Sequence, residues 1–246
     1  MGQGTVTCSF NTKPVWNAFS AGPGIAAGIH LWHGNVADFA GMQQQFHALL
    51  SPAEQQAAAR FYRQADRDRY IIQHGLLVVL LRWYLEDAEL KPSYIYNPNK
   101  KPFLSNRFDC YFNLSNTGDE FLIAVGDSAM GIDIERVNPN FAYADVASYY
   151  FGSEELEYIN QSADPHQAFF LLWTRKESLL KACGSGIDDN LPQIPALDGT
   201  HDLPAYFDSA NWVTDSFMAD SGAMVSVTHV LPGNGMNLWQ INADSI

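Results

Sequence analysis

Two acidic side chains, Asp133 and Glu135, stand two residues apart in the segment MGIDIER (residues 130–136). Apolar residues alternate with Gly131, Asp133 and Glu135, which predicts a strand with one buried face, because successive side chains of a strand point to opposite sides. Both carboxylates then point the same way, roughly 7 Å apart. Like charges raise each other's pKa unless a cation lies between them, and hard oxygen ligands suit Mg²⁺ or Mn²⁺. A strand with a solvent-exposed acidic face is the alternative, and for this segment alone it is the more common structure.

A second polar pair, Glu177 and Lys181, lies in the segment WTRKESLLK (residues 173–181). Trp173, Glu177 and Lys181 are spaced four residues apart and share one face of a helix, which Phe169 extends upstream. A Glu–Lys pair at this spacing is most often a weak salt bridge on the surface. The large apolar residues in line with the pair predict instead that it lies at the edge of the core.

Two similar sets of helices are expected to position these segments. The capping box S-P-A-E at residues 51–54 predicts the start of a short helix, and a long apolar helix is expected over residues 69–86. In the second half, Ser153 is expected to cap another short helix. A second long helix is expected over residues 166–183, ended by Gly184.

Runs with strand character precede and follow the long helices. They are residues 28–32, 93–96, 110–114, 120–125, 205–207, 211–217, 223–229 and 238–241. The repeated order of short helix, long helix and strands predicts an α+β fold of two pseudo-symmetric halves, each an antiparallel sheet with a long helix. Residues 1–28 are expected to be a loosely held leader, residues 29–125 the first half and residues 126–246 the second.

The 246 residues are 47% hydrophobic and carry a net charge of −13. Such a chain can bury a full core, and its charge disfavours a general nucleic-acid binder. No apolar run approaches the roughly 20 residues of a membrane-spanning helix, and the N-terminal sequence lacks the features of a secretory signal. Three widely separated cysteines argue against a disulfide framework, so the cytoplasm is the expected location. Residues 1–125 hold ten of the 14 Lys and Arg residues, which would suit an anion, whereas residues 126–246 hold 17 of the 27 acids.

Together, the segments GIDIE (residues 131–135) and WTRKESLLK (residues 173–181) resemble the paired signature of the 4′-phosphopantetheinyl transferases, in their larger, surfactin-synthetase-activating (Sfp-type) class. Shorter segments agree in the same order: RFY at 60–62, DR at 68–69, KPF at 101–103 and FNLS at 112–115. The resemblance implies the phosphopantetheinyl transferase fold. It also implies an enzyme that moves phosphopantetheine from coenzyme A to a serine of an acyl, peptidyl or aryl carrier protein and releases 3′,5′-ADP.

The resemblance implies roles for individual residues as well. Asp133, Glu135 and Glu177 would hold Mg²⁺ against the pyrophosphate. Lys181 would meet a phosphate, and Glu177 would accept the serine proton, directly or through water. The residues implied in coenzyme A binding are Arg69, Lys100, Lys101, Pro102, Ser115, Asn116 and Lys181.

One position departs from the family pattern, because Asn116 stands where a histidine normally contacts the coenzyme A phosphate. Asparagine donates a hydrogen bond but carries no charge, so weaker coenzyme A binding or an altered pH dependence is expected. A catalytically weakened relative that only binds coenzyme A or a carrier protein is therefore an alternative function. A structural protein with purely surface acids is another. For Arg69, a surface ion pair with Asp66 or Asp68 is the alternative to ligand binding.

By resemblance, the carrier protein is acidic around its serine. An enzyme with a net charge of −13 must then meet it through a local basic or apolar patch. Candidates for this patch are Arg136, Arg175, Lys176 and the apolar residues within 141–151. The duplicated layout predicts a monomer, because each half supplies what a second subunit would otherwise provide.

Overall fold

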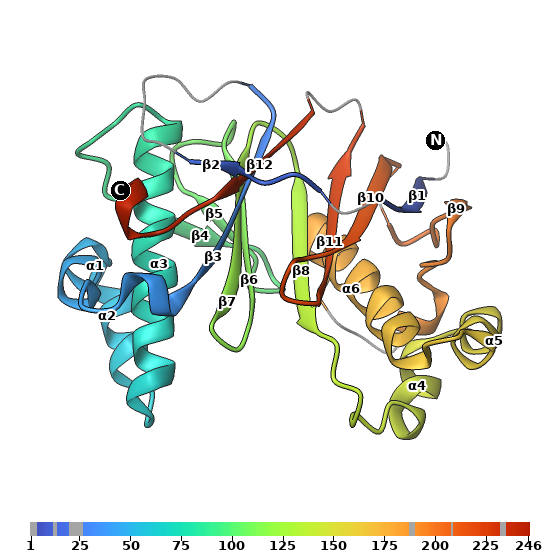
Figure 1. The fold of residues 1–246 in the computed structure, drawn as a ribbon. Coiled ribbons are helices and arrows are strands. Elements are labelled where there is room, and N and C mark those ends of the chain that lie inside the picture. The colour runs from blue at the N-terminus through green and yellow to red at the C-terminus, as the bar shows by residue number, and fades with distance from the viewer. Residues whose placement is uncertain (1–3, 12–13, 20–26, 187–189, 208, 232–234) are drawn as a thin grey trace.

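Two lobes lie side by side in the computed structural model, each built from a five-stranded sheet and a long helix (Figure 1). The structure describes residues 4–11, 14–19, 27–186, 190–207, 209–231 and 235–246. The N-lobe contains the long helix α3 (Gln64–Tyr84), and the C-lobe contains α6 (Pro165–Cys183). This arrangement confirms the expected α+β fold.

The N-lobe sheet has the strand order β2-β12-β3-β7-β6, and the C-lobe sheet has the order β8-β11-β10-β1-β9. The strands are β1 (Thr5–Phe10), β2 (Asn17–Ala18), β3 (Ile29–Asn35), β4 (Tyr94–Tyr96), β5 (Pro102–Leu104), β6 (Tyr111–Thr117), β7 (Glu120–Gly126), β8 (Met130–Arg136), β9 (Gly199–Asp202), β10 (Asn211–Met218), β11 (Ala223–Val230) and β12 (Met236–Gln240). The other helices are α1 (Gln43–Leu49), α2 (Pro52–Ala59), α4 (Ala144–Tyr150) and α5 (Ser153–Gln161), and short 3₁₀ turns are η1 (Val36–Phe39), η2 (Leu191–Gln193) and η3 (Ala243–Ser245). None of the helices in the described ranges is long and apolar enough to span a membrane.

Helix α3 covers one face of the N-lobe sheet with an apolar surface. Leu76 and Leu80 are fully buried and belong to one cluster with Trp32 and Phe121 of the sheet. Burial of such side chains stabilises the fold by about 1.5–3 kcal/mol each. The capping box predicted at residues 51–54 is present at the start of α2.

Helix α6 covers the C-lobe sheet in the same way, but this interface contains buried hydroxyl groups. Thr174 Oγ1 lies 2.8 Å from Ser226 Oγ, and Ser178 Oγ lies 2.8 Å from Thr228 Oγ1. Gly184 ends the helix with φ of 72°, in the left-handed region that favours glycine, as the sequence predicts.

Some predicted elements differ from the structure. Both sheets are mixed rather than antiparallel, because β1 pairs in parallel with β10 and β12 pairs in parallel with β2 and β3. Helix α3 begins at Gln64, earlier than predicted, because the polar residues 64–68 form its first turns. Gly152, rather than Ser153, is the N-cap of α5. Residues 205–207 form a turn instead of the predicted strand, and the strand of this region is β9.

The prediction of a loosely held leader is wrong for residues 5–10. These residues form β1, in which Val6 and Cys8 are buried and which pairs with β10 and β9. The alternation is too short to be distinctive in the sequence, and the pairing comes from segments about two hundred residues away. The chain passes from the N-lobe sheet to the C-lobe sheet between β7 and β8, close to the proposed boundary between residues 125 and 126. The last strand, β12, returns to the N-lobe sheet, so the two lobes do not coincide with two continuous halves of the chain.

Candidate functional site

Helix α6 lies directly against β8 of the C-lobe sheet at Gly131. A Cβ atom at this position would lie 2.1 Å from the carbonyl oxygen of Ser178 and 2.3 Å from the backbone nitrogen of Ala182. Only glycine therefore allows the helix to lie directly on the strand. The next two residues on the same face of β8 are Asp133 and Glu135, and this contact brings them beside α6.

Asp133 is buried and bound by two side chains from different elements. Its Oδ1 atom accepts hydrogen bonds from Lys181 Nζ at 2.6 Å and from Ser115 Oγ at 2.9 Å. Lys181 Nζ also donates to Ser115 Oγ at 3.1 Å, so α6, β8 and β6 meet at this carboxylate. Asp133 Oδ2 is buried and has no hydrogen-bond partner in the described part of the chain.

The other two carboxylates predicted at this site, Glu135 and Glu177, are both close enough to Asp133 and Lys181 to be affected by their charges. Burial, together with the negative charge of Asp133, raises the pKa of Glu135 to about 7. Burial also raises the pKa of Glu177 to about 7, where the charge of Lys181 opposes the shift and Asp133 adds to it. Glu177 Oε1 is a second buried oxygen without a hydrogen-bond partner among the described residues. The site therefore disfavours the fully ionised state unless a cation compensates it.

These observations decide whether a divalent cation fits the residues present. Carboxylate oxygens are the ligands that Mg²⁺ and Mn²⁺ prefer, and two buried ones at this site, Asp133 Oδ2 and Glu177 Oε1, have no hydrogen-bond partner among the described residues. Within the described ranges, no group of three His, Cys, Asp or Glu residues is already arranged to hold a metal ion. Lys181 takes the Oδ1 atom of Asp133 in this arrangement. The donor set fits the cation in chemistry, and the metal itself remains a proposal.

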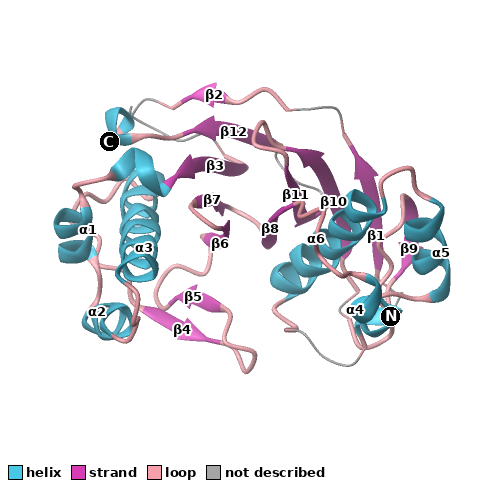
Figure 2. Ribbon diagram, turned by 60° about the horizontal axis from the view of Figure 1, so that its bottom comes forward, coloured by secondary structure: helices cyan, strands magenta, loops and turns pink. Residues whose placement is uncertain are grey.

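A cavity of about 200 Å³ opens beside this cluster, between the turn that joins β4 to β5 and the end of α6. Figure 2 shows the β4–β5 hairpin reaching from the N-lobe toward that end of α6. Its lining includes Asn99, Lys100, Lys101, Pro102, Asn113, Glu177, Leu180, Lys181, Gly184 and Gly186. Side chains of the turn hold it in place, because Asn97 Nδ2 and Asn99 Nδ2 donate to the Gly184 carbonyl oxygen at 2.8 and 2.9 Å.

Lys101 connects the two lobes at the wall of this cavity. Its Nζ atom donates to the carbonyl oxygen of Ala182 at 2.7 Å and to that of Met130 at 3.2 Å. Burial lowers the pKa of Lys101 to about 8. The ammonium group is thus occupied by backbone carbonyls of α6 and β8.

Two predicted residues, Arg69 and Asn116, lie outside this group. Arg69 forms ion pairs with Asp66 and with Asp119, the latter at 2.6 Å from its Nε. The surface ion pair was the alternative for Arg69, and Asp66 is one of the two partners expected. Asn116 is exposed on β6, and strand alternation directs it away from the face on which Ser115 reaches Asp133.

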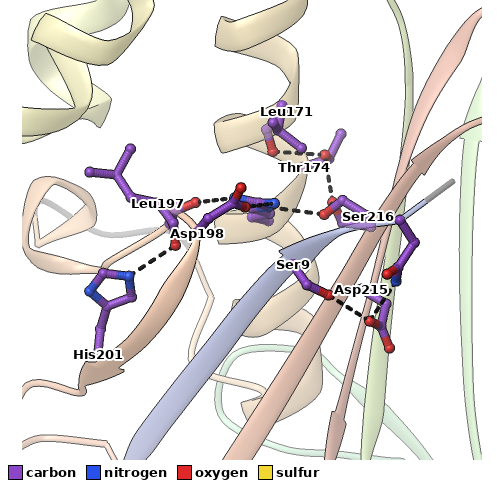
Figure 3. A network of polar contacts seen from close by, with 12 residues as sticks. Ser9, Leu171, Thr174, Leu197, Asp198, His201, Asp215 and Ser216 are labelled. Carbon is purple, nitrogen blue, oxygen red and sulfur yellow. Dashed lines mark hydrogen bonds and ion pairs between the residues drawn. The ribbon is translucent and has the colours of Figure 1, made fainter.

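The prediction that Arg175 and Lys176 form part of a docking patch is wrong, because both side chains are buried. Arg175 donates to Ser216 Oγ at 3.0 Å and forms an ion pair with Asp198 at 2.6 Å. Figure 3 shows Ser216 and Asp198 in this polar network beside α6. Lys176 forms an ion pair with Glu155 at 2.7 Å and is fully buried. Both side chains therefore point from α6 toward the C-lobe sheet and the segment of residues 191–198, rather than to solvent.

Sequence reasoning missed two residues, Asn113 and Thr117, that reach from β6 to β8. Asn113 Oδ1 accepts a hydrogen bond from the Ile132 N–H, and Thr117 Oγ1 accepts one from the Arg136 N–H. The signal for them was present in FNLSNT (residues 112–117), where residues 113, 115 and 117 are polar and share one face of the strand.

A second hollow, of about 390 Å³, begins at Glu135 and continues over the C-lobe surface. It is lined by Glu135, Arg136, Asn138, Phe141, Val146, Tyr150, Phe169, Phe170 and Trp173. Arg136 is exposed at its rim. This surface is called the aromatic groove below, and it adjoins the carboxylate cluster through Glu135.

Comparison with known proteins finds similarity to 4′-phosphopantetheinyl transferases, both in a family model and in individual relatives. A family model described as the 4′-phosphopantetheinyl transferase superfamily matches residues 129–212, which contain β8 and α6. The 4′-phosphopantetheinyl transferase HetI of Nostoc sp. is 33% identical over 165 residues, which cover 65% of this chain and 70% of HetI. The 4′-phosphopantetheinyl transferase psf-1 of Bacillus pumilus is 30% identical over 160 residues, with 62% and 66% of the two chains covered. The 4′-phosphopantetheinyl transferase Sfp of Bacillus subtilis is 26% identical over 148 residues, with 58% and 64% covered.

Proposed function

Because the chain belongs to the 4′-phosphopantetheinyl transferase superfamily, we propose that it transfers 4′-phosphopantetheine from coenzyme A to a serine hydroxyl of an apo acyl or peptidyl carrier protein, releasing adenosine 3′,5′-bisphosphate. The observation that supports this most directly is the cluster of Asp133, Glu135, Glu177 and Lys181 beside a cavity at the junction of the lobes. Phosphoryl-group transfer needs neutralised charge and a well-placed nucleophile, and this cluster offers groups for both.

Mg²⁺ or Mn²⁺ is the proposed cofactor, held by Asp133, Glu135 and Glu177. When bound, the cation would neutralise negative charge on the pyrophosphate oxygens. The unpartnered oxygens of Asp133 and Glu177 support this assignment, because a buried carboxylate oxygen without a partner is costly.

Lys181 and Glu177 are the proposed catalytic residues. Lys181 lines the cavity and is held by Asp133 and Ser115, so its ammonium group is oriented before a substrate arrives. We assign it to the negative charge of the departing phosphate. Glu177 lines the same cavity as Lys181, so its carboxylate is placed to accept the serine proton, directly or through water.

Coenzyme A is the proposed donor substrate. Lys100 and Pro102 line the cavity and are assigned to its phosphate and adenine end, together with Ser115, Asn116 and the more distant Arg69. Lys101 belongs to the same site, but its ammonium group bonds to two backbone carbonyls. We therefore assign Lys101 to shaping the cavity wall.

The aromatic groove is the proposed contact surface for the carrier protein. Its apolar lining suits a helix face, and exposed Arg136 at the rim provides a cation for an acidic partner. The groove begins at Glu135, so a carrier bound there would present its serine next to the carboxylate cluster. We also propose that the protein is a monomer, since one chain supplies both walls of the cavity. The cytoplasm is its proposed location.

Asn116 supports a second candidate function, a catalytically weakened relative that binds coenzyme A or a carrier protein. An uncharged side chain at a position where the family has histidine would weaken a phosphate contact. Calorimetry with coenzyme A separates the two functions, because binding without turnover favours the weakened relative.

The decisive experiment mixes the protein with coenzyme A, Mg²⁺ and an apo carrier that a known phosphopantetheinyl transferase modifies. The carrier should gain about 340 Da, the mass of the transferred phosphopantetheine. Asp133→Ala should abolish this gain while folding is retained, and Asp38→Ala, at an exposed acid of the N-lobe, is the matched control. An unmodified carrier with the wild-type enzyme would refute the transferase proposal, and an active Asp133→Ala variant would refute the metal assignment.

A further inference from the structure

The junction of the lobes is formed by two strands, β6 and β8, that belong to different sheets and contact each other. As far as the structure describes them, β8 pairs with β11 and β6 pairs with β7, and each is the last strand of its sheet. The free edge of a strand carries N–H groups that cost free energy if they are buried without an acceptor. Because β8 is buried along residues 130–134, its free edge needs partners from outside the sheet.

Side chains of β6 provide these partners. Asn113 Oδ1 accepts a hydrogen bond from the Ile132 N–H at 2.9 Å, and Thr117 Oγ1 accepts one from the Arg136 N–H at 3.1 Å. The first bond is made one residue before Asp133, and the second one residue after Glu135. The two bonds therefore hold the β8 backbone on both sides of the carboxylate pair.

Thr117 makes an additional contact with the carboxylate itself. The same hydroxyl group that accepts from Arg136 can donate its proton to Glu135 Oε2, which lies at 3.4 Å. On the neighbouring position of the same face, Ser115 Oγ donates to Asp133 Oδ1. Each carboxylate of the pair thus has its own hydroxyl partner on β6, in matching register.

We propose that Asn113 and Thr117 are positioning residues, which fix β8 by side-chain hydrogen bonds so that Asp133 and Glu135 face Glu177 in the geometry that binds a divalent cation. This inference rests on the proposed function, because the cation is what gives the alignment its purpose. Metal sites depend on the groups that orient their ligands, and loss of such a group typically weakens metal affinity about 10- to 100-fold. Neither residue contacts the cation in this proposal.

The test measures Mn²⁺ binding to the full-length protein by isothermal titration calorimetry, together with kcat and KM. Thr117→Val keeps the shape of the side chain and removes the hydroxyl, and it should weaken Mn²⁺ binding about tenfold or more. Thr117→Ser should recover most of that affinity, to within about threefold of the wild type. Thr7→Val is the matched control, because Thr7 bonds through its hydroxyl to Thr200 on β9, in a pair of strands remote from the cluster.

The kinetic readout separates positioning from a general loss of stability. In Thr117→Val, kcat should fall and recover partly at high Mn²⁺ concentration, while the KM for the carrier stays near the wild-type value. Asn113→Ala should weaken Mn²⁺ binding in the same direction, and it replaces Thr117→Val as the test if that variant does not fold. Unchanged Mn²⁺ affinity in the folded variant overturns the positioning role.

Failure of the proposed function gives a different result. A wild-type protein that binds Mn²⁺ but never modifies a carrier would refute the transferase proposal, while weaker binding by Thr117→Val would still support the positioning role. A wild-type protein that binds no Mn²⁺ would overturn the positioning role together with the metal assignment.

Discussion

The two lobes share the same layout of one long helix on one sheet, but the side chains buried between the helix and the sheet differ greatly from one lobe to the other. Beneath α3 the interface is apolar, with Leu76 and Leu80 against Trp32 and Phe121. Beneath α6 it includes hydroxyl groups and two fully or almost fully buried cations, Arg175 and Lys176. The helix with the polar interface is the one that carries Glu177 and Lys181.

This difference shows how the fold divides its tasks. Apolar packing is non-directional, so it does not by itself fix the rotation of α3 about its axis. Hydrogen bonds and ion pairs are directional, and they fix the rotation and position of α6 against the sheet. We infer that the polar interface holds Glu177 and Lys181, the proposed catalytic side chains, in register with β8, whereas the apolar interface mainly stabilises the N-lobe.

The largest expected effect comes from Lys176→Met, which removes one of the two buried cations beneath α6. Glu155 would be left buried beside two backbone carbonyls, of Leu191 and Ile194, that have lost their donor. Loss of one partner of a buried ion pair costs about 3–5 kcal/mol, so the free energy of unfolding should fall by that amount. Urea unfolding followed by circular dichroism measures it.

The double variant Lys176→Met with Glu155→Gln tests the cause of this loss. Removing both charges should cost less than the sum of the two single changes, because no uncompensated charge stays buried. Strictly additive costs would show that the pair is not coupled and would weaken the contrast between the lobes.

A smaller loss of unfolding free energy is expected from Gly131→Ala, and Gly75→Ala in the N-lobe is the matched variant. At Gly131 a Cβ would meet the backbone of α6, whereas at Gly75 in α3 it would lie 2.4 Å from Cβ of Phe46 in α1. Each change should cost about 1–3 kcal/mol by overpacking. Only Gly131→Ala should also remove transferase activity per folded molecule, since it displaces Glu177 and Lys181 from β8. Equal residual activity in the two variants would contradict the division of tasks.

The sequence predicted the parts of this site that local patterns encode. Alternation marked Asp133 and Glu135 on one face of β8, and helical spacing placed Glu177 with Lys181 on one stripe of α6. The same patterns could not show that Arg175 and Lys176 are buried, because their partners Asp198 and Glu155 come from distant segments. Similarly, β1 depends on pairing with β10, which no local pattern reveals.

A still smaller effect is expected from Ser178→Ala, which removes one hydroxyl from the polar interface. Ser178 Oγ donates to the Arg175 carbonyl oxygen and lies 2.8 Å from Thr228 Oγ1. Thr228 keeps a partner in Thr214, so the variant should lose only about 1 kcal/mol of unfolding free energy. Differential scanning calorimetry measures this loss, and a loss above about 3 kcal/mol would mean that the hydroxyl groups act as one network.

Two acidic sites, the carboxylate cluster of Asp133, Glu135 and Glu177 and the N-lobe residue Glu54, should contribute to stability with opposite pH dependence when no divalent cation is present. In the carboxylate cluster, Glu135 and Glu177 have pKa values raised to about 7, above the ordinary value of 4.5. Between these values the folded protein binds more protons than the unfolded chain, so this cluster makes the protein more stable as the pH falls from about 7 toward 4.5. In the N-lobe, burial tends to raise the pKa of Glu54, but hydrogen bonds from His74 and Ser51 hold it below 4.5. Its contribution is therefore present above pH 4.5 and is lost as the pH falls through the lower folded value.

Unfolding free energies measured in EDTA across pH 4–8 test both signs. Glu177→Gln should flatten the curve between pH 4.5 and 7, whereas Glu54→Gln should leave that range unchanged and flatten only its acidic end. Added Mn²⁺ should reverse the trend of the wild type near pH 7, because the cation favours the ionised carboxylates and stabilises the folded state by mass action. A Glu177→Gln curve parallel to that of the wild type would show that Glu177 ionises normally in the metal-free protein, and it would contradict the predicted pH dependence of the carboxylate cluster.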